Sequence, residues 1–450
     1  MSNKSSKTVK STAAGDSVSV DGSRYTITMS GEGSSVFDSG DHNRTTLTGA
    51  NQSATLSGDN GELVSTGIGA FVSLGGTRNA ATVTGDGAFM MIGGTRNDAT
   101  LGGAGAAANV SGSNNDMNAT GDGIAIFLRG TRNDVTMRGD QSTVSDLGTH
   151  NRIELRGDGN SASLAGSDGV IAVTGDTNFV RLQGSDDSAR VYSDSNTIVD
   201  TGTGNLTRLA GHGNTARLVG TDGTVIATED GASLQLIGVR NTALVHGDHV
   251  SLLDIGTGDT LVLRGDHANA TVIGSDAHIT STGRGNAISV TGSGASIDAS
   301  GAAITLGGGV SASLDGGNDT ITMGLDSTLS LTDFSGDVIH ASGADDADVL
   351  ALGGTFSHEQ LRFANSHGDL VISVRGRHSQ SVTVADWFDS PDNHISTIKT
   401  SDGFSISDQG VDQLVQAMAS FPSSGHDHGH WSHGSSDALA PILAANWQHG

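Results

Sequence analysis

The sequence has no cysteine, 3 prolines among 450 residues and only 4% aromatic residues. Without cysteine, the chain cannot form a disulfide, even in an oxidising compartment. Lysine and arginine number 23 against 49 aspartates and glutamates, which gives a formal net charge of -26. Nucleic-acid binding needs clustered basic residues, so we expect no nucleic-acid partner.

Long hydrophobic runs are also missing. No segment approaches the ~20 apolar residues of a membrane-spanning helix, so we do not expect an integral membrane protein. Residues 1–21 contain lysines but no apolar run like that of a secretory signal peptide. We therefore expect no N-terminal signal peptide, and we interpret residues 1–21 as a disordered tail.

Glycine, in contrast, is abundant, with 67 residues. From Gly22 to Gly309 the chain divides into 32 consecutive nine-residue units, and 30 of them begin with glycine. Typical units are GTRNAATVT (76–84) and GTHNRIELR (148–156). The sixth and eighth residues are mostly apolar and lie two apart, so they share one face of a strand. Each unit predicts a short strand after a G-x-x-N turn, where glycine and asparagine tolerate positive φ.

Such short strands bury their apolar face only by stacking, which predicts an all-β chain folded as a parallel β-solenoid over 22–309. Alternate units differ. Those of the odd series, such as 76–84 and 130–138, favour Gly-Thr-x-Asn, whereas those of the even series, such as 85–93 and 157–165, favour Gly-Asp. The alternation predicts a flattened β-roll with about 18 residues per coil. A three-sided coil of about 27 residues is the alternative.

A longer period is superimposed on the nonads, since residues 40–309 form five blocks of 54. Asp146, Asp200 and Asp254 recur at the eighth position of their units, and Asp38 holds the matching place earlier. We interpret these aspartates as acceptors of hydrogen bonds from turn amides after duplication of a three-coil unit. A row of cation sites is the alternative.

The nonad resembles the haemolysin-type calcium-binding repeat of RTX proteins, G-G-x-G-x-D-x-U-x. That resemblance implies calcium binding through the sixth-position aspartate, but residues such as Ala81, Ala99 and Val135 stand there. Calcium needs oxygen ligands, so we expect the solenoid to need no cofactor. Residues 310–355 resemble a degenerate end of the repeat, and Asp315, Asn318 and Asp319 are candidate ligands for a single calcium ion.

A second resemblance covers residues 356–421. The segments LRFA (361–364), GDLVISV (368–374), SVTVADWF (381–388) and DGFSI (402–406) resemble the haemolysin-type calcium-binding related domain. They alternate as strands do, and apolar residues at helical spacing follow from Val411. We therefore expect a small β-rich cap with a short C-terminal helix. Residues 422–450 end in ALAPILAANW (438–447), which is similar to the tails of type I secreted proteins. The resemblance implies export to the extracellular space by an ABC transporter.

The same tail carries a histidine cluster, formed by His426, His428, His430 and His433. Neutral imidazole binds Zn²⁺, Ni²⁺ and Cu²⁺, so these residues are candidate ligands of a transition metal. The alternative is a solvated linker.

Catalytic patterns are missing. Serine, histidine and aspartate lie at repeat-surface positions without a nucleophile, base and orienting acid in a recognisable arrangement, and the uninterrupted repeat leaves no loop insertion for a cleft. We therefore expect no enzyme.

Three classes of function remain. The first is a secreted structural or adhesive protein of a biofilm matrix or cell surface, with self-association or matrix polysaccharide as its partner. The second is a carbohydrate- or ice-binding solenoid, since Thr82, Thr100 and Thr136 point outward from odd-series strands. The third is a calcium-binding effector of RTX type. Exposed apolar side chains on the even-series strands mark the candidate interaction surface: Phe37, Phe71, Phe89, Met91, Phe127 and Phe179.

Overall fold

The computed structural model describes residues 7–341, 347–420 and 445–449. The chain divides into two compact units, residues 1–232 and 233–450, which we call the N-terminal and C-terminal units and describe separately. Their solenoid has about 19 turns in total, at about 18 residues per turn. Across the described ranges, no helix has both the length and the apolar character needed to cross a membrane.

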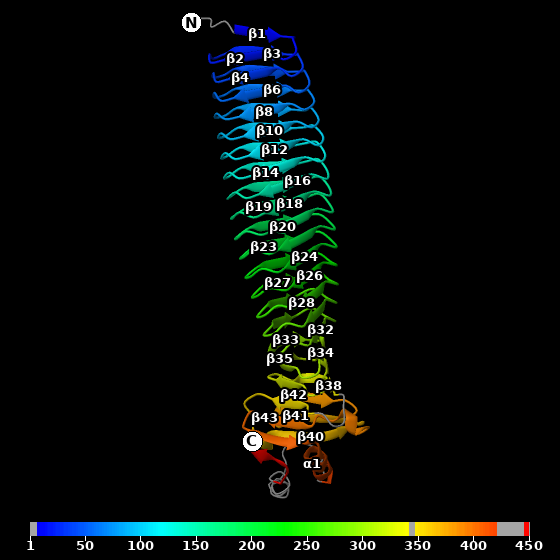
Figure 1. Cartoon of the computed structure of the whole chain (residues 1–450). Helices are drawn as coiled ribbons and strands as arrows, with labels where there is room; N and C mark the ends of the chain where they lie inside the picture. The colour runs from blue at the N-terminus through cyan, green and yellow to red at the C-terminus, as the bar shows by residue number, and fades with distance from the viewer. Residues whose placement is uncertain (1–6, 342–346, 421–444, 450) are drawn as a thin grey trace. The chain divides into compact units, whose positions relative to one another are not determined.

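The N-terminal unit is a stack of short strands (Figure 1). It contains β1 (Lys7–Ser11), β2 (Ser17–Val20) and β3 (Tyr25–Met29), then four-residue strands from β4 (Ser35–Asp38) to β25 (Thr224–Ala227), each beginning nine residues after the one before. Strands pair in parallel with the strand two places along, so Phe71 of β8 (Phe71–Leu74) aligns with Phe89 of β10 (Phe89–Ile92). Each coil therefore has two strands and 18 residues, as predicted, and the 27-residue alternative is wrong.

The core of the solenoid lies between its two sheets, as the nonad pattern predicts. In β11 (Asp98–Leu101), Ala99 and Leu101 are fully buried, whereas the side chain of Asp98 is exposed. The same alternation recurs in the neighbouring strands. Each buried aliphatic side chain contributes about 1.5–3 kcal/mol before the entropy of ordering is subtracted, so stability accumulates along the stack.

Buried asparagines at the fourth position form ladders between coils. In the odd series, Oδ1 of Asn133 accepts a hydrogen bond from the backbone N–H of Asn115 at 3.0 Å, and its Nδ2 donates to the carbonyl of Gly112 at 3.1 Å. The bond from the backbone N–H to Oδ1 recurs in the even series at Asn160, Asn178, Asn196 and Asn214. These amides satisfy buried backbone groups at the turns, where an unpaired group would be costly.

The turn geometry differs from the prediction. Positive φ falls on the third residue of the unit, as at Arg78, Arg96 and Arg132 (φ 55–60°), whereas the fourth-position asparagine is the buried ladder residue. The opening glycine is needed for a different reason. A Cβ on Gly130 would lie 1.7 Å from the carbonyl oxygen of Gly112 in the preceding coil, so at this position the two coils approach too closely for a side chain.

Residues 7–20 were expected to belong to a disordered tail, and this expectation is wrong. They form β1 and β2, which pair in parallel with β3 and β4. Ser17–Val20 has the alternation of a repeat strand, but its unit opens with Ala13 where the repeat rule requires glycine. The solenoid pattern thus extends below Gly22, and residues 1–6 lie outside the described part of the chain.

The C-terminal unit continues the same pattern and then loses its regularity. Strands β26 (Ser233–Leu236) to β32 (Ala287–Val290) keep the nine-residue interval; then follow β33 (Ala295–Ser300), β34 (Ala303–Leu306), β35 (Ser311–Gly317), β36 (Thr320–Thr322), β37 (Thr328–Leu331), β38 (Ser335–His340) and β39 (Val349–Leu352). Ala287 aligns with Ala303, 16 residues later. Ile304 and Leu306 both point inward. The inward pair therefore lies two residues earlier than the predicted nonad at 301–309 places it, and the turn before it is shorter.

The end of the C-terminal unit covers the edges of the last solenoid strands. Its elements are η1 (His358–Gln360), β40 (Leu361–Ser366), β41 (Asp369–Val374), β42 (Arg377–Val384), η2 (Pro391–Asn393), β43 (Thr397–Thr400), β44 (Phe404–Ser407), α1 (Asp408–Ser420) and β45 (Gln448–His449). Strands β42 and β43 pair in parallel with β38 and β39, and on their other sides pair with antiparallel strands. The region occupies edges that would otherwise invite aggregation, which agrees with the predicted β-rich cap and short helix.

Candidate functional sites

The structure places all six predicted surface residues of the N-terminal unit on exposed positions of even-series strands. Phe71 and Phe89 lie on neighbouring strands, and their rings stack with centroids 5.9 Å apart and an interplanar angle of 18°. Met91 lies two residues further along the strand of Phe89. These three side chains, which we call the aromatic patch, are 37–42% exposed. The patch consists of the stacked Phe71 and Phe89 rings with Met91 on the same face of β10.

The other three predicted residues are separated from the aromatic patch. Asn109 occupies the strand between Met91 and Phe127 at the same register. Phe37 is aligned with Thr55 on the next strand of its sheet. Phe179 stands between Ser161 and Thr197, with no aromatic neighbour in register. The structure therefore brings together three of the six residues and leaves Phe37, Phe127 and Phe179 as separate exposed rings.

The outward threonines of the odd-series sheet do not form a continuous array. Val64 stands in register between Thr46 and Thr82. Asn118 separates Thr100 from Thr136, and Glu154 follows Thr136. A regular hydroxyl lattice of the kind that the ice-binding alternative needs is interrupted at each of these positions.

The candidate calcium ligands in the C-terminal unit do not converge. Asp315 is exposed on β35, aligned with the exposed Asp298. Asn318 is an exposed turn residue with a φ of 62°. Asp319 is buried, and its Oδ1 accepts a hydrogen bond from the backbone N–H of Ala302 at 2.8 Å. Since Asp315 faces solvent and Asp319 faces the interior, the fragment does not fit one calcium ion.

The second candidate metal site, formed by His426, His428, His430 and His433, lies outside the described residues. Within the ranges that the structure does describe, no three or more His, Asp or Glu side chains are grouped so as to hold a metal ion.

The recurring aspartates of the 54-residue period accept hydrogen bonds from turn amides, as the main interpretation predicted. Asp146 is buried, and its Oδ1 accepts from the backbone N–H of Gly148 at 2.8 Å and from Nδ2 of Asn151 at 2.7 Å. The same two bonds recur at Asp38 and Asp200. Burial raises the pKa of the Asp146 carboxyl, although both hydrogen bonds oppose the rise.

Asp254 departs from this pattern because the residue five places later is Asp259 instead of asparagine. Burial raises the pKa of Asp259, and the hydrogen bond and the charge of Asp254 raise it further. The backbone N–H of Asn241 donates to Oδ1 of Asp259 at 2.8 Å and opposes this rise. The buried pair therefore resists loss of its second proton.

Buried carboxyls also stand at the fourth position, where sequence reasoning expected only a turn. Burial raises the pKa of Asp187 to about 6 and that of Asp337 to about 7. Each accepts one hydrogen bond from a backbone N–H through Oδ1, and each Oδ2 is buried without a hydrogen-bond partner. Their sequence signal is an aspartate at the position that asparagine occupies in most units.

A polar and aromatic cluster in the C-terminal unit was not anticipated from sequence. Nδ1 of His358 lies 2.9 Å from Oδ2 of Asp402, and its ring stacks on Phe404 with centroids 3.8 Å apart. Trp447, which is largely buried, packs against the same imidazole. Burial opposes ionisation of Asp402, but hydrogen bonds from Thr400 and His358 outweigh it and hold the pKa of Asp402 at about 2.

A second such contact surrounds Trp387, which is fully buried. Its Nε1 donates to Oδ1 of Asp412 on α1 at 2.9 Å, and its ring stacks on His394 with centroids 4.2 Å apart. These contacts fix the helix and the β42–β43 connection against each other, so we assign them a structural role.

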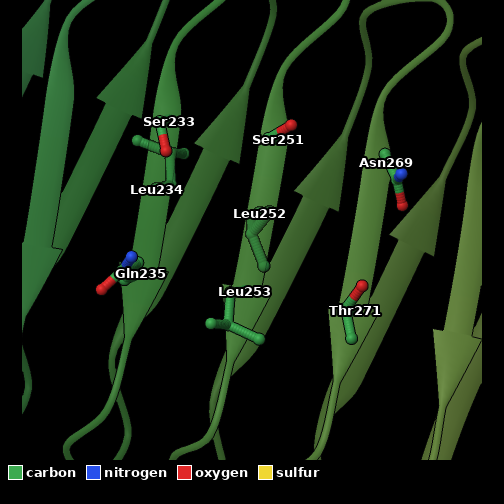
Figure 2. A pocket seen from close by; sticks show the side chains of 8 residues that line it. All are labelled: Ser233, Leu234, Gln235, Ser251, Leu252, Leu253, Asn269 and Thr271. Carbon is green, nitrogen blue, oxygen red and sulfur yellow. The ribbon is translucent and has the colours of Figure 1, made fainter.

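A shallow depression of about 270 Å³ lies on the even-series sheet of the C-terminal unit. Figure 2 shows its lining residues on neighbouring strands β26, β28 (Ser251–Asp254) and β30 (Asn269–Val272). The polar lining residues are Ser233, Gln235, Ser251, Asn269 and Thr271, and Leu253 adds an apolar side chain. The surface offers hydroxyl and amide groups but no charged group.

Comparison with known proteins supports one of the two resemblances. A model of the haemolysin-type calcium binding protein related domain matches residues 369–409, inside the predicted range of 356–421. The match extends from β41 to the beginning of α1 and includes the buried Trp387. No curated protein matches the chain.

Proposed function

We propose that this chain is a secreted extracellular protein with a structural and adhesive role in a biofilm matrix or at a cell surface. The haemolysin-type calcium-binding related domain, which is typical of secreted proteins, supports the extracellular location. The observation that carries the adhesive role is the aromatic patch. Large apolar side chains held together on the solvent face of a sheet usually mark an interaction site.

The proposed contact is between the aromatic patch and the apolar faces of matrix polysaccharide. The Phe71 and Phe89 rings are fixed by their strands and stack on each other, so little side-chain entropy is lost on binding. Replacing Phe71 and Phe89 with serine is expected to lower retention on the producing cells or their matrix at least about tenfold, the equivalent of about 1.4 kcal/mol. The melting temperature stays unchanged, because both positions are exposed.

Phe179→Ser is the matched control for a single Phe89→Ser change. Both rings are similarly exposed, at 40% and 37%, but Phe179 has serine and threonine neighbours. We expect Phe89→Ser to reduce retention more than Phe179→Ser. Equal retention of the wild type and the double variant would refute the adhesive role of the patch.

Export by a type I ABC transporter is the second part of the proposal, and it rests on the resemblance of the C-terminal tail. Deleting residues 423–450 is expected to leave the protein inside the cell. That deletion also removes Trp447 and β45, which contact His358 and β44. Trp447→Ala in the full chain therefore serves as the control, because it disturbs the same packing and keeps the tail. Normal export of the deletion variant would contradict the assignment.

Carbohydrate binding at the C-terminal unit is a second candidate function, favoured by the depression in Figure 2. Its uncharged amides and hydroxyls suit the hydroxyl groups of a neutral sugar. Gln235→Ala with Asn269→Ala is expected to abolish the signal on a glycan array while the aromatic-patch variant keeps it. An unchanged signal would exclude this surface.

A further inference from the structure

The two turn edges of the N-terminal unit carry different chemistry. Each coil has one odd-series turn and one even-series turn, and successive turns of one series lie 18 residues apart. Aspartates at the second position of five consecutive even-series units form what we call the acidic edge: Asp122, Asp140, Asp158, Asp176 and Asp194. All five side chains belong to exposed residues.

The carboxylates of the acidic edge are held in fixed orientation. Oδ1 of Asp140 accepts a hydrogen bond from the backbone N–H of Asp158 at 2.8 Å, and Oδ1 of Asp158 accepts from Asp176 at 2.8 Å. The same bond recurs along the row. Each carboxylate thus has one oxygen bound to the next coil, and like charges about 4.8 Å apart repel one another. A cationic partner would relieve this repulsion.

The odd-series turns from 76 to 150 carry the complementary groups. Exposed Arg78, Arg96 and Arg132 stand at the third position, and His150 continues the row. None of the three arginines forms an ion pair with any residue that the structure describes. We call this row the basic edge.

Hydroxyl groups adjoin the basic edge at the second position. Thr77, Thr95, Ser113, Thr131 and Thr149 are aligned in register along neighbouring coils. The carboxylates of Asp98, Asp116 and Asp134 stand at the fifth position, on the adjoining sheet face, so the edge itself presents arginine and hydroxyl donors.

The two rows match when one copy is shifted by two coils along the other. Taking the third-position residue first, the opposed pairs are Arg78 with Asp122, Arg96 with Asp140, Asn114 with Asp158, Arg132 with Asp176, His150 with Asp194 and Asp168 with His212. Every pair joins a donor or cation to a carboxylate. The next pair, Asp186 with Asp230, is the first that joins two acids.

We propose that the basic edge of one copy docks against the acidic edge of a second, parallel copy, shifted by about 10 Å (two strand layers). Both edges have the same coil repeat, so one contact aligns all the others. The contact joins different surfaces of the two copies, and it therefore generates an open lateral array instead of a closed dimer. This assembly uses neither the aromatic patch nor the depression of the C-terminal unit, so it stands apart from the adhesive role.

The test is a charge exchange between the two edges, read by sedimentation velocity of the full chain in low salt with EDTA. Variant A carries Arg78→Asp, Arg96→Asp and Arg132→Asp. Asp168 and Asp186 already occupy the third position with the same positive φ. Variant B carries Asp122→Arg, Asp140→Arg and Asp176→Arg. Circular dichroism confirms that both variants are folded.

Wild type is expected to associate in a concentration-dependent way that salt suppresses, because exposed charges are screened. Each variant alone raises the dissociation constant at least about tenfold, the equivalent of about 1.4 kcal/mol. Mixing A with B restores association, since each edge then meets its complement. The control Arg181→Asp, Arg190→Asp and Arg208→Asp has the net charge of variant A and associates like wild type.

Three results would overturn the inference: a wild type that stays monomeric in low salt, a variant A that associates like wild type, or an A and B mixture that stays dissociated. Loss of adhesion in the Phe71 and Phe89 variant, with association unchanged, would leave this inference standing. The two proposals therefore fail separately.

Discussion

Replacing Asp187 with asparagine is expected to stabilise the N-terminal unit at neutral pH, because it removes a buried carboxyl whose ionisation lowers the stability of the fold. Asp187 holds the ladder position that Asn133 and Asn151 hold in other coils, and it is buried. Its Oδ1 accepts a hydrogen bond from the backbone N–H of Gly169 at 2.8 Å, while Oδ2 has no hydrogen-bond partner. Burial, with smaller contributions from nearby acids, raises the pKa of Asp187 from 3.8 to about 6.

The sign follows from proton linkage. Between pH 4 and 6 the folded chain keeps a proton on Asp187 that the unfolded chain releases, so stability falls as pH rises through this window and then levels off. Each pKa unit corresponds to about 1.36 kcal/mol, which sets an upper limit of about 3 kcal/mol above pH 6. Solvent near the turn reduces the effect, so we expect about 1–3 kcal/mol.

The assay is native-state hydrogen exchange of the Gly169 amide, converted to an opening free energy from pH 4 to pH 8. Asp187→Asn is expected to raise that free energy at pH 7.5 and to leave it nearly unchanged at pH 4. The exposed neighbour Asp186, changed to asparagine, is the matched control and has no such effect. An equal gain at both pH values, or no gain at pH 7.5, would refute the assigned role of the buried charge.

Three further changes test other parts of the structure. Asp259→Asn rebuilds the pair that Asp146 makes with Asn151, so the C-terminal unit gains stability above pH 7 and loses the fall in stability that ionisation of Asp259 causes between about pH 4 and pH 7, measured by thermal melts across pH. Gly130→Ala places a Cβ 1.7 Å from a backbone carbonyl oxygen and is expected to cost about 3 kcal/mol or more in chemical denaturation, whereas Gly93→Ala, with no contact under 3.8 Å, stays close to wild type. Asp402→Asn removes a carboxylate whose pKa is lowered to about 2. The ionised carboxylate stabilises the fold above about pH 4, and this stabilisation is lost as the pH falls towards 2. The variant cap is therefore expected to be more sensitive to proteolysis than wild type at pH 7 and equal to wild type near pH 2.

The repeat made the solenoid predictable from sequence. An apolar pair at positions six and eight fixed the inward face, and the difference between the odd and even series fixed a coil of two strands, which the pairing of Phe71 with Phe89 confirms. The same rule failed where a structural unit does not open with glycine. Because the unit that contains β2 opens with Ala13, the strands before Gly22 were not predicted. The coil that ends with Ile304 and Leu306 is two residues shorter than the regular nine-residue count predicted.

The sites were harder to predict because they depend on contacts between distant residues. Asparagine at the fourth position indicated a turn, whereas its side chain is a buried ladder rung, as at Asn133. His358 and Asp402 lie 44 residues apart in sequence, so no spacing rule connects them. The stacking of Phe71 on Phe89 was accessible, because a coil of 18 residues places them side by side.

The interactions that hold the coils together can be tested by removing metal. Buried apolar side chains such as Ala99 and Val135 stand at the sixth position, where the RTX repeat places its calcium-binding aspartate, and asparagine ladders at the fourth position join successive coils. The fold should therefore need no metal. Far-UV circular dichroism and thermal unfolding, recorded in EDTA and then in excess calcium, measure this dependence. We expect the same β signal and the same midpoint for the solenoid in both solutions. Loss of the β signal in EDTA, restored by calcium, would contradict this expectation.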